Sequence, residues 1–215
     1  MGLKKRVLAA ILASAMVLST AVTAFAAGSP ANADYNTETK ADENTQDHTG
    51  NEVVTKVTKK AATVVKVTGD GENAEDVVLK IARDKNNKKK AITVIGDGKK
   101  GVFDSKAGRK VKTVRVKSSK KVTVKAKAFK GSKVKKLLST SKIKFNKNAF
   151  KGTKVKALRI TVYAKKASRI SFVKGSFTGL SNKAKFVVKG MSKTEFKKLK
   201  KALKAAGFKG KIARL

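Results

Sequence analysis

The protein has 215 residues, of which 53 are Lys or Arg and 14 are Asp or Glu, so its net charge is +39, and it contains no cysteine. The absence of cysteine excludes a disulfide framework and a lipoprotein attachment site, so packing alone must hold the fold together. Basic and acidic residues balance at 13 each over 34–104, whereas 105–215 holds 37 basic residues and one acid, Glu195. The excess charge belongs to the second half and indicates an anionic partner.

The N-terminus has the three parts of a secretory signal peptide. Lys4–Arg6 is the basic start, Val7–Val22 is apolar apart from small Ser and Thr, and Ala24–Ala26 forms a small-x-small cleavage motif. We expect cleavage after Ala26, with Ala33 as the alternative position, and a signal peptide over 1–26. This predicts a secreted, extracellular protein, either released or retained at the cell surface. An uncleaved membrane anchor is the other interpretation, because the apolar segment is just long enough to span a bilayer.

A polar segment follows the signal. Residues 27–51 are rich in Asn, Thr, Asp and Glu and show no apolar periodicity, so we expect a disordered linker. His48, the one histidine of the sequence, lies in this segment without a ligand-type partner at metal-binding spacing, and we assign it no role.

Short β-branched runs predict strands from residue 52 onward. Lys59-Lys60 suits a hairpin turn, and the glycines of Gly69-Asp70-Gly71 and Gly96-Asp97-Gly98 supply the positive φ that ends a strand. The stretch 73–83 fits either a strand or a helix. We expect 52–89 to form an N-terminal β cap that covers the first repeat described below. The runs are 53–57, 63–67, 77–81 and 91–95.

Four carboxylates crowd together before the third of these runs. They are consistent with a turn or with a calcium site, but their spacing lacks the Asp-x-Asp-x-Asp-Gly order and the distal Glu of a calcium loop. We therefore favour a turn, and we predict no metal and no cofactor. The residues are Asp70, Glu72, Glu75 and Asp76.

The second half of the chain repeats itself. A Lys-Val-Lys run that leads into a β-branched strand occurs four times, the last time loosely, and the first two intervals are 23 and 21 residues. A second marker, Ala-Phe-Lys-Gly, precedes each strand at a nearly constant offset. One strand per period of this length is typical of a leucine-rich-repeat solenoid. The runs are 110–116, 133–138, 154–160 and 183–188, and the markers are 128–131 and 149–152, with weaker copies at 103 and 176–180.

These motifs resemble the bacterial surface-antigen, BspA-like family of leucine-rich repeats. The resemblance covers about 91–188: Ala-Phe-x-Gly, a Val/Leu-x-x-Leu-x-Ile strand, and a second short strand such as 141–145. Ser132 or Thr153 stands where the family usually has Cys after the Gly. The resemblance implies a secreted or surface-displayed binding scaffold without catalytic residues. We expect a mainly β fold with some α, a short solenoid of parallel strands over 90–190, with the N-terminal β cap and a C-terminal helical cap.

That helical cap is expected over 191–215. Ser192 and Glu195 form a Ser-x-x-Glu capping box, and Gly207 is the stop signal. Residues 208–215 are suited to a closing strand. The exposed face is basic, so the helix either docks its apolar stripe on the last repeat or lies on an anionic membrane surface; we favour docking. The stripe is Phe196, Leu199, Leu203 and Ala206, and the basic face is Lys197, Lys198, Lys200, Lys201 and Lys204.

The repeat strands also predict a basic ladder. Apolar positions of a Val-x-x-Val-x-Val strand face the core, so the intervening cations stand on the outer face of the sheet, with strands about 5 Å apart. Such a ladder suits an anionic polymer held by counterion release. The other interpretation is a solvated surface that keeps a sheet-rich protein soluble. The ladder residues are Lys112, Arg115, Lys135, Lys136, Lys156 and Arg159.

The repeats hold no histidine, no cysteine and one carboxylate, so nothing supports general acid–base or nucleophilic catalysis, and we predict that the protein is not an enzyme. The expected function is adhesion to an anionic cell-wall or glycan polymer through the basic sheet face. The alternatives are a module that binds an extracellular protein, with lysines for solubility, and an extracellular DNA-binding protein. Aromatic residues are 6% of the chain and fall mostly at repeat core positions, which argues against base stacking.

Overall fold

The computed structural model describes residues 35–36, 52–68, 75–84, 86 and 88–215, and these belong to one unit, Asp34–Leu215. The expected signal peptide (1–26), the alternative cleavage site at Ala33, His48 and the acidic residues Asp70 and Glu72 lie outside the described residues. Of the expected linker, 27–51, the structure describes Tyr35–Asn36, which forms a two-residue strand.

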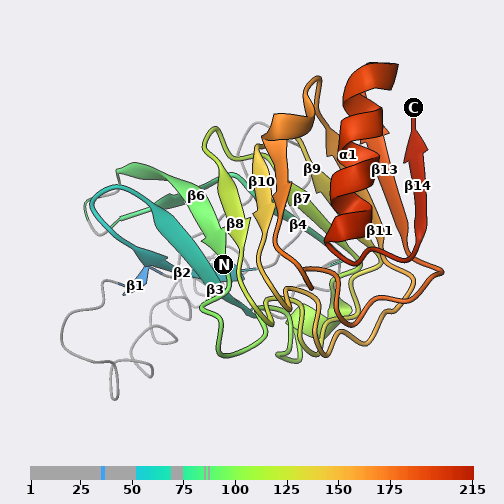
Figure 1. Ribbon diagram of the computed structural model, residues 1–215. Helices are drawn as coiled ribbons and strands as arrows, with labels where there is room; N and C mark the ends of the chain where they lie inside the picture. The colour runs from blue at the N-terminus through green and yellow to red at the C-terminus, as the bar shows by residue number, and fades with distance from the viewer. Residues whose placement is uncertain (1–34, 37–51, 69–74, 85, 87) are drawn as a thin grey trace, which may run out of the picture. The chain divides into compact units, whose positions relative to one another are not determined.

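Strands dominate the described chain, as its β-branched runs predict. The expected class, mainly β with some α and with parallel strands, is confirmed (Figure 1). The strands are β1 (Tyr35–Asn36), β2 (Glu52–Val57), β3 (Ala62–Thr68), β4 (Asp76–Leu79), β5 (Ile81–Arg83), β6 (Lys89–Ile95), β7 (Thr113–Val116), β8 (Val122–Val124), β9 (Lys136–Ser139), β10 (Ile143–Phe145), β11 (Arg159–Tyr163), β12 (Ile170–Phe172), β13 (Lys185–Lys189) and β14 (Lys211–Arg214); the helices are α1 (Lys193–Ala205) and the 3-10 turns η1 (Gly108–Lys110) and η2 (Ala167–Arg169).

The N-terminal part begins with the expected hairpin. β2 and β3 pair antiparallel across the turn that holds Lys59 and Lys60. The segment for which the sequence allowed a strand or a helix forms strands over its described residues, β4 and β5. Gly96 and Gly98 take positive φ after β6, as predicted, whereas the turn at 69–71 lies outside the described residues.

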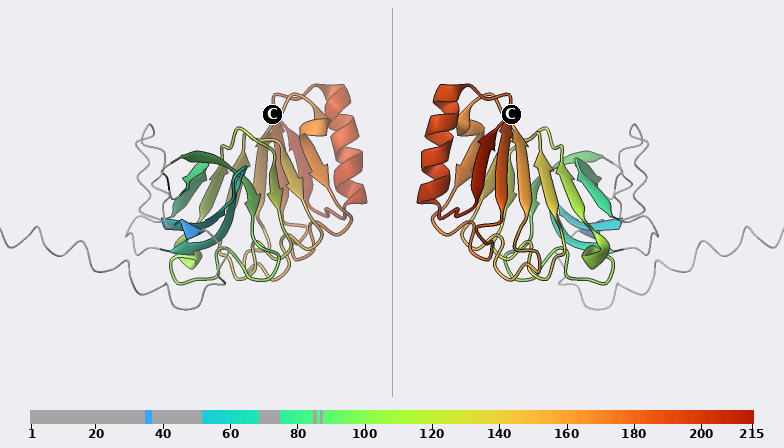
Figure 2. Two further views of the ribbon diagram at one scale, coloured as in Figure 1. Left: turned by 90° about the vertical axis from the view of Figure 1, so that its left-hand side faces the viewer. Right: turned by 90° about the vertical axis from the view of Figure 1, so that its right-hand side faces the viewer.

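From β6 to β13 the chain alternates between two sheets, and α1 then leads to β14, which joins the second sheet beside β13. The first sheet has the order β1-β2-β3-β6-β8-β10-β12, with β5 also paired to β6, and the second has the order β14-β13-β11-β9-β7-β4. Every pair from β6 to β12 in the first sheet, and every pair in the second, is parallel. Each circuit of chain thus adds one strand to each sheet, so the second short strand in the sequence pattern builds a sheet of its own (Figure 2).

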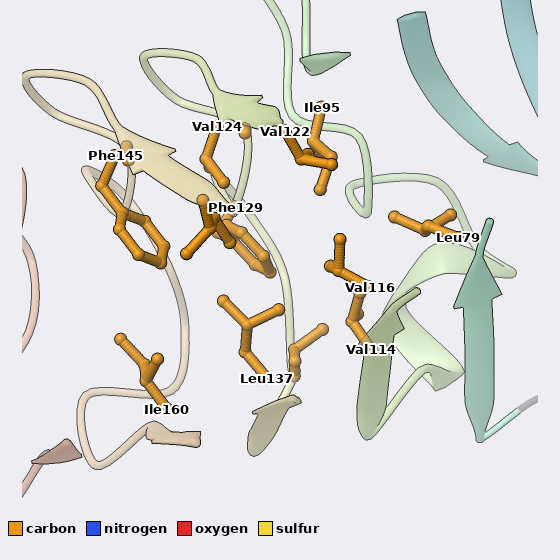
Figure 3. Close-up of a cluster of buried hydrophobic side chains, with 14 of the residues drawn as sticks. Leu79, Ile95, Val114, Val116, Val122, Val124, Phe129, Leu137, Phe145 and Ile160 are labelled. Atoms are coloured by element: carbon orange, nitrogen blue, oxygen red, sulfur yellow. The ribbon is translucent and has the colours of Figure 1, made fainter. Parts of the chain in front are cut away.

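The core lies between the two sheets. In Figure 3, Val114, Leu137 and Ile160 of the second sheet project toward Val124 and Phe145 of the first, and all five side chains are fully buried. Side chains alternate between faces along a strand, so burying these residues leaves their neighbours in the sequence on the outer face. Burial of each large apolar side chain stabilises the fold by about 1.5–3 kcal/mol.

The Ala-Phe markers form a column of stacked rings. Phe103, Phe129, Phe150 and Phe177 follow one another, with centroids 5.2 Å, 5.1 Å and 6.0 Å apart. All four rings are buried. The recurring Phe therefore gives each circuit the same contact with the next, which is why the motif repeats in the sequence.

The turns that carry these markers are also hydrogen-bonded to one another. Gly131 and Gly152 have φ of 72° and 80°, and the Gly131 N–H donates to the Gly152 carbonyl at 2.9 Å. The hydroxyl groups of Ser132 and Thr153 lie 3.4 Å apart in the buried interior. A buried pair of hydroxyl groups therefore joins the two marker turns. The turns gather at one end of the strands (Figure 2).

The C-terminal helix forms as predicted, with one change to its cap. Ser192 Oγ accepts a hydrogen bond from the Glu195 N–H at 3.3 Å, which is half of a capping box. The Glu195 carboxylate does not complete the box; it accepts from the Ala167 N–H and from Lys198 Nζ, each at 2.8 Å. The helix is therefore fastened to η2, beside β12 at the end of the first sheet.

The apolar stripe of α1 is docked. Leu199, Leu203 and Ala206 are buried, and Phe196 packs against the core. Gly207 ends the helix with φ 88°, and the expected closing strand, β14, pairs parallel with β13. The docked interpretation of the stripe is thus confirmed. None of the helices in the described part of the chain is long and apolar enough to cross a membrane.

Candidate functional site

The six cations of the predicted ladder do not occupy equivalent positions. Three of them lie on strands of the second sheet: Arg115 on β7, Lys136 on β9 and Arg159 on β11. Lys112 and Lys135 immediately precede their strands, and Lys156 lies in the turn before β11. The prediction that all six stand together on one outer sheet face is therefore wrong for the last three.

The register explains the difference. Lys136 is the direct partner of Arg159, but Arg115 pairs with Leu138, two positions further along β9. Thr113 pairs with Lys136, and Lys136 pairs with Arg159, so paired residues on neighbouring strands are 23 positions apart in the sequence each time. The sequence motifs suggested a separation of 21 residues between β9 and β11. The two extra residues are taken up in the turn before β11. A shift of two preserves the face, so Arg159 still points outward.

The row that the structure does form contains two cations that the sequence reasoning missed. Arg159 pairs with Lys185 on β13, and Lys185 pairs with Lys211 on β14. Four exposed cations therefore occupy successive strands, which run about 4.8 Å apart. The signal was present, because each of these strands begins with a cation followed by an apolar residue. We call Lys136, Arg159, Lys185 and Lys211 the cation row.

Acidic residues neutralise the N-terminal end of this face. Arg115 donates from Nη2 to Asp76 Oδ2 at 2.8 Å and from Nε to the same oxygen at 3.2 Å. Lys112 Nζ lies 3.3 Å from Glu75 Oε1. Glu75 and Asp76, considered above as turn or calcium residues, thus form ion pairs with two predicted ladder residues. In the part of the chain that the structure describes, no ion pair involves a member of the cation row.

A less polar row runs beside the cation row, two residues further along each strand. Its members are cross-strand partners in the same parallel register. Thr161 is 6% exposed and Val187 4% exposed, although both share the outward face with the cations, so the longer side chains around them cover them. We call Leu138, Thr161, Val187 and Ala213 the middle row.

The two rows meet in a shallow depression at the C-terminal end of the sheet. Its volume is about 140 Å³. Cations of the cation row lie on one side, middle-row residues form the floor, and Leu215, which is 65% exposed, forms the opposite wall. The lining residues are Arg159, Lys185, Lys211, Val187, Ala213 and Leu215.

A third outward row includes an exposed aromatic ring. Tyr163 is 41% exposed and is the cross-strand partner of Lys189. The Lys189 ammonium lies 5.5 Å from the centroid of the Tyr163 ring, within range of a cation–π interaction. Cationic and apolar groups are therefore interleaved across the outer face of the second sheet.

The outer face of the first sheet differs. Its corresponding row across β8, β10 and β12 is Thr123, Lys144 and Ser171, which are register partners and only partly exposed. One cation on three strands does not make a row of charge. Within the strands themselves the cations therefore concentrate on the second sheet, whereas Lys121, Lys142 and Arg169 immediately precede β8, β10 and β12.

The described residues contain no group of three or more His, Cys, Asp or Glu side chains that could hold a metal ion. The shifted carboxyls serve structural roles. Hydrogen bonds from Lys198 and the Ala167 N–H hold the pKa of Glu195 below its ordinary value. Burial acts to raise the pKa of Asp97, but the hydrogen bonds from the backbone N–H groups of Lys100 and Lys99 outweigh burial, so the pKa of Asp97 lies below its ordinary value.

No family model, no curated protein and no solved structure matches the chain.

Proposed function

We propose that this chain is a secreted, non-catalytic leucine-rich-repeat protein that binds a linear anionic polymer along the cation row. The observation that carries the proposal is the parallel register that places Lys136, Arg159, Lys185 and Lys211 on four successive strands. The polymer is a wall polymer or glycan of the cell envelope or its surroundings, and the protein is either released or retained at the cell surface.

Several structural features support a leucine-rich-repeat solenoid of the BspA-like kind as the scaffold. Parallel strands follow one another in register, the Phe markers stack, and the marker turns are hydrogen-bonded from one circuit to the next. Such an array exposes an open core face at each end. The β2–β3 hairpin and α1 are placed at the two ends of the first sheet's repeat strands, as caps over 52–89 and 191–215 require.

Electrostatics favours a bound anion over a bare cation row. Two like charges at the strand spacing repel by somewhat less than about 1 kcal/mol in water, and salt reduces this further. The row contains three such neighbouring pairs and no acidic group on its strands to offset them. When a polymer with a negative charge at each step binds, each cation of the row gains an attractive interaction with the polymer. The polymer also releases its counterions, which favours binding further.

The test is binding of the purified protein to a purified anionic wall polymer, a sulfated glycan and duplex DNA at about 50 and 500 mM salt. Replacing the four cations of the row by Gln should abolish the binding. The matched control removes the same charge from the exposed face of α1, and should retain most of the binding. Equal loss in both variants would show a diffuse charge effect and contradict the proposal. The control residues are Lys197, Lys200, Lys201 and Lys204.

The same experiment separates the alternatives. A module that recognises a specific extracellular protein, with its lysines serving solubility, predicts weak binding to every polymer that does not depend on the cation row. A DNA-binding protein predicts preference for the duplex. The absence of catalysis is part of the proposal, and turnover of a bound polymer during these measurements would contradict it.

A further inference from the structure

We infer that the depression at the C-terminal end of the cation row is a subsite for an acidic sugar residue, so that the polymer is an acidic polysaccharide rather than a polyphosphate or a duplex nucleic acid. The inference rests on the proposed function, because it names the polymer class that the same face binds. It is carried by the combination of cations and apolar side chains in one hollow.

The lining has two chemically different sides. Arg159, Lys185 and Lys211 supply three positive charges from adjacent strands, while Ala213 and Leu215 supply apolar surface beside Val187, which is 4% exposed. The cationic side chains alone are sufficient to bind an anion through hydrogen bonds. The apolar floor adds recognition only for a ligand that has an apolar surface beside its negative charge.

The two sides extend across the sheet in parallel rows. Lys185 and Val187 lie two residues apart on β13, and Lys211 and Ala213 lie two residues apart on β14, so the rows are separated by about 7 Å along each strand. A ligand lying across β13 and β14 therefore passes a cation and an apolar side chain on each strand, at a step of about 4.8 Å. The repeating unit that fits has one charge and one apolar face per step.

A pyranose ring with a carboxylate or sulfate substituent has this character, because its axial C–H groups form an apolar face and its acidic group projects from the ring edge. A polyphosphate chain has charge without an apolar face. A B-form duplex keeps its base faces stacked inside and presents charged phosphates without an apolar face beside them.

Two exposed side chains with apolar surface on the same sheet face support the same ligand, Leu215 in the lining of the hollow and Tyr163 outside it. Leu215 is 65% exposed and Tyr163 is 41% exposed, on the outer face of a sheet that is otherwise edged with lysine. Apolar side chains gathered at a polar-rimmed hollow mark a contact surface. The Tyr163 ring, with Lys189 above it, offers a further stacking surface for the next sugar along the chain.

The test compares an oligogalacturonate with an inorganic polyphosphate of equal charge, using the intact protein at about 50 and 300 mM salt. Ala213→Leu fills the hollow without a change in charge, and Leu215→Ser removes its apolar wall. We expect each variant to lower oligogalacturonate affinity by about tenfold and to change polyphosphate affinity by less than about twofold. Val173→Ser, at a residue that is 38% exposed elsewhere, should change neither.

The outcomes distinguish the inference from the proposed function. If both polymers bind equally and both variants leave the ratio of affinities unchanged, the subsite is wrong and the cation row remains an anion-binding face. If neither polymer binds at the lower salt concentration, the proposed function fails as well. Because Leu215 is 65% exposed and lies outside β14, Leu215→Ser provides the readout even if Ala213→Leu disturbs that strand.

Discussion

Lys136 on β9 and Arg159 on β11 are direct partners in a parallel register, so two cations face solvent side by side with no acid between them. This arrangement costs stability, since like charges directly opposite each other destabilise a sheet by a few tenths of a kcal/mol or more. Removing the repulsion should therefore stabilise the fold while removing function.

Lys136→Glu tests this trade-off. The new carboxylate faces Arg159, so we expect the free energy of unfolding to rise by about 0.3–1 kcal/mol and polymer affinity to fall by at least about tenfold at low salt. Urea unfolding and equilibrium binding measure the two quantities. Lys144→Glu, on the first sheet, is the matched control and should leave affinity within about twofold. A variant that is less stable and still binds would contradict both parts of the expectation.

Because the Phe rings stack on one another, removal of a single ring should lower the stability of the fold strongly. Phe129 lies between Phe103 and Phe150 and is fully buried, so Phe129→Ala should lower the free energy of unfolding by about 3–5 kcal/mol. Tyr163→Ala, at an exposed ring of similar size, should cost less than about 1 kcal/mol. Urea denaturation of both variants gives the comparison. Similar costs would show that the column does not hold the repeats together.

Two glycines with positive φ should respond differently to the same substitution. Gly179 has φ 103°, and a Cβ there would strike the Phe150 carbonyl oxygen, whereas Gly190 has φ 77° and nothing within 4 Å. Gly190→Ala should therefore cost only the backbone strain of about 1–2 kcal/mol. Gly179→Ala should cost at least about 1 kcal/mol more, because the neighbouring turn must move. Thermal unfolding of the two variants measures the difference, and equal costs would contradict the close approach of these turns.

Glu195 gives the fold a dependence on pH. Its folded-state pKa lies below its ordinary value, first because of the Lys198 hydrogen bond and then because of the Ala167 N–H, so the ionised form is favoured by folding. Its contribution to stability is present above the ordinary pKa of 4.5 and is lost as pH falls through the lower folded value.

Glu195→Gln should thus lose stability near neutral pH and flatten the stability curve below about pH 5. Urea unfolding at a series of pH values measures this. Asp84, whose pKa is lowered mainly by the Lys88 N–H, and Asp97 remain in the variant and will retain part of the acid sensitivity. An unchanged curve would show that the contact between α1 and η2 contributes nothing.

The sequence was sufficient to predict those parts of the fold that depend on local patterns. The hairpin at Lys59-Lys60, the repeat strands, the helix between Ser192 and Gly207 and its docked stripe were predicted correctly, because turn chemistry, period and caps act over a few residues. Which of the two sheets a strand joins, by contrast, depends on contacts between residues that are far apart in the sequence. The pattern showed two strands per repeat, but it did not show that they form separate sheets facing one another.

The candidate site was harder to predict because it depends on register. Lys136 and Arg159 were found, but two residues absorbed in a turn placed Lys156 off the sheet. The neutralising acids are Asp76 on β4 and Glu75 just before it, both distant in the sequence. Lys185 and Lys211 were missed because the step between partners lengthens after β11, where η2 and then α1 are inserted between successive strands of the second sheet. The charge was visible in the sequence, whereas its alignment required the structure.

The slope of log affinity against log salt concentration is the most direct test of the cation row. Each anionic contact contributes about 0.7–0.9 to the slope for nucleic-acid polymers, so replacing Lys136, Arg159, Lys185 and Lys211 by Gln should reduce its magnitude by roughly three. The α1 control variant should keep the original slope. A four-residue variant with the slope of the unaltered protein would show that the polymer is held elsewhere and would contradict the account.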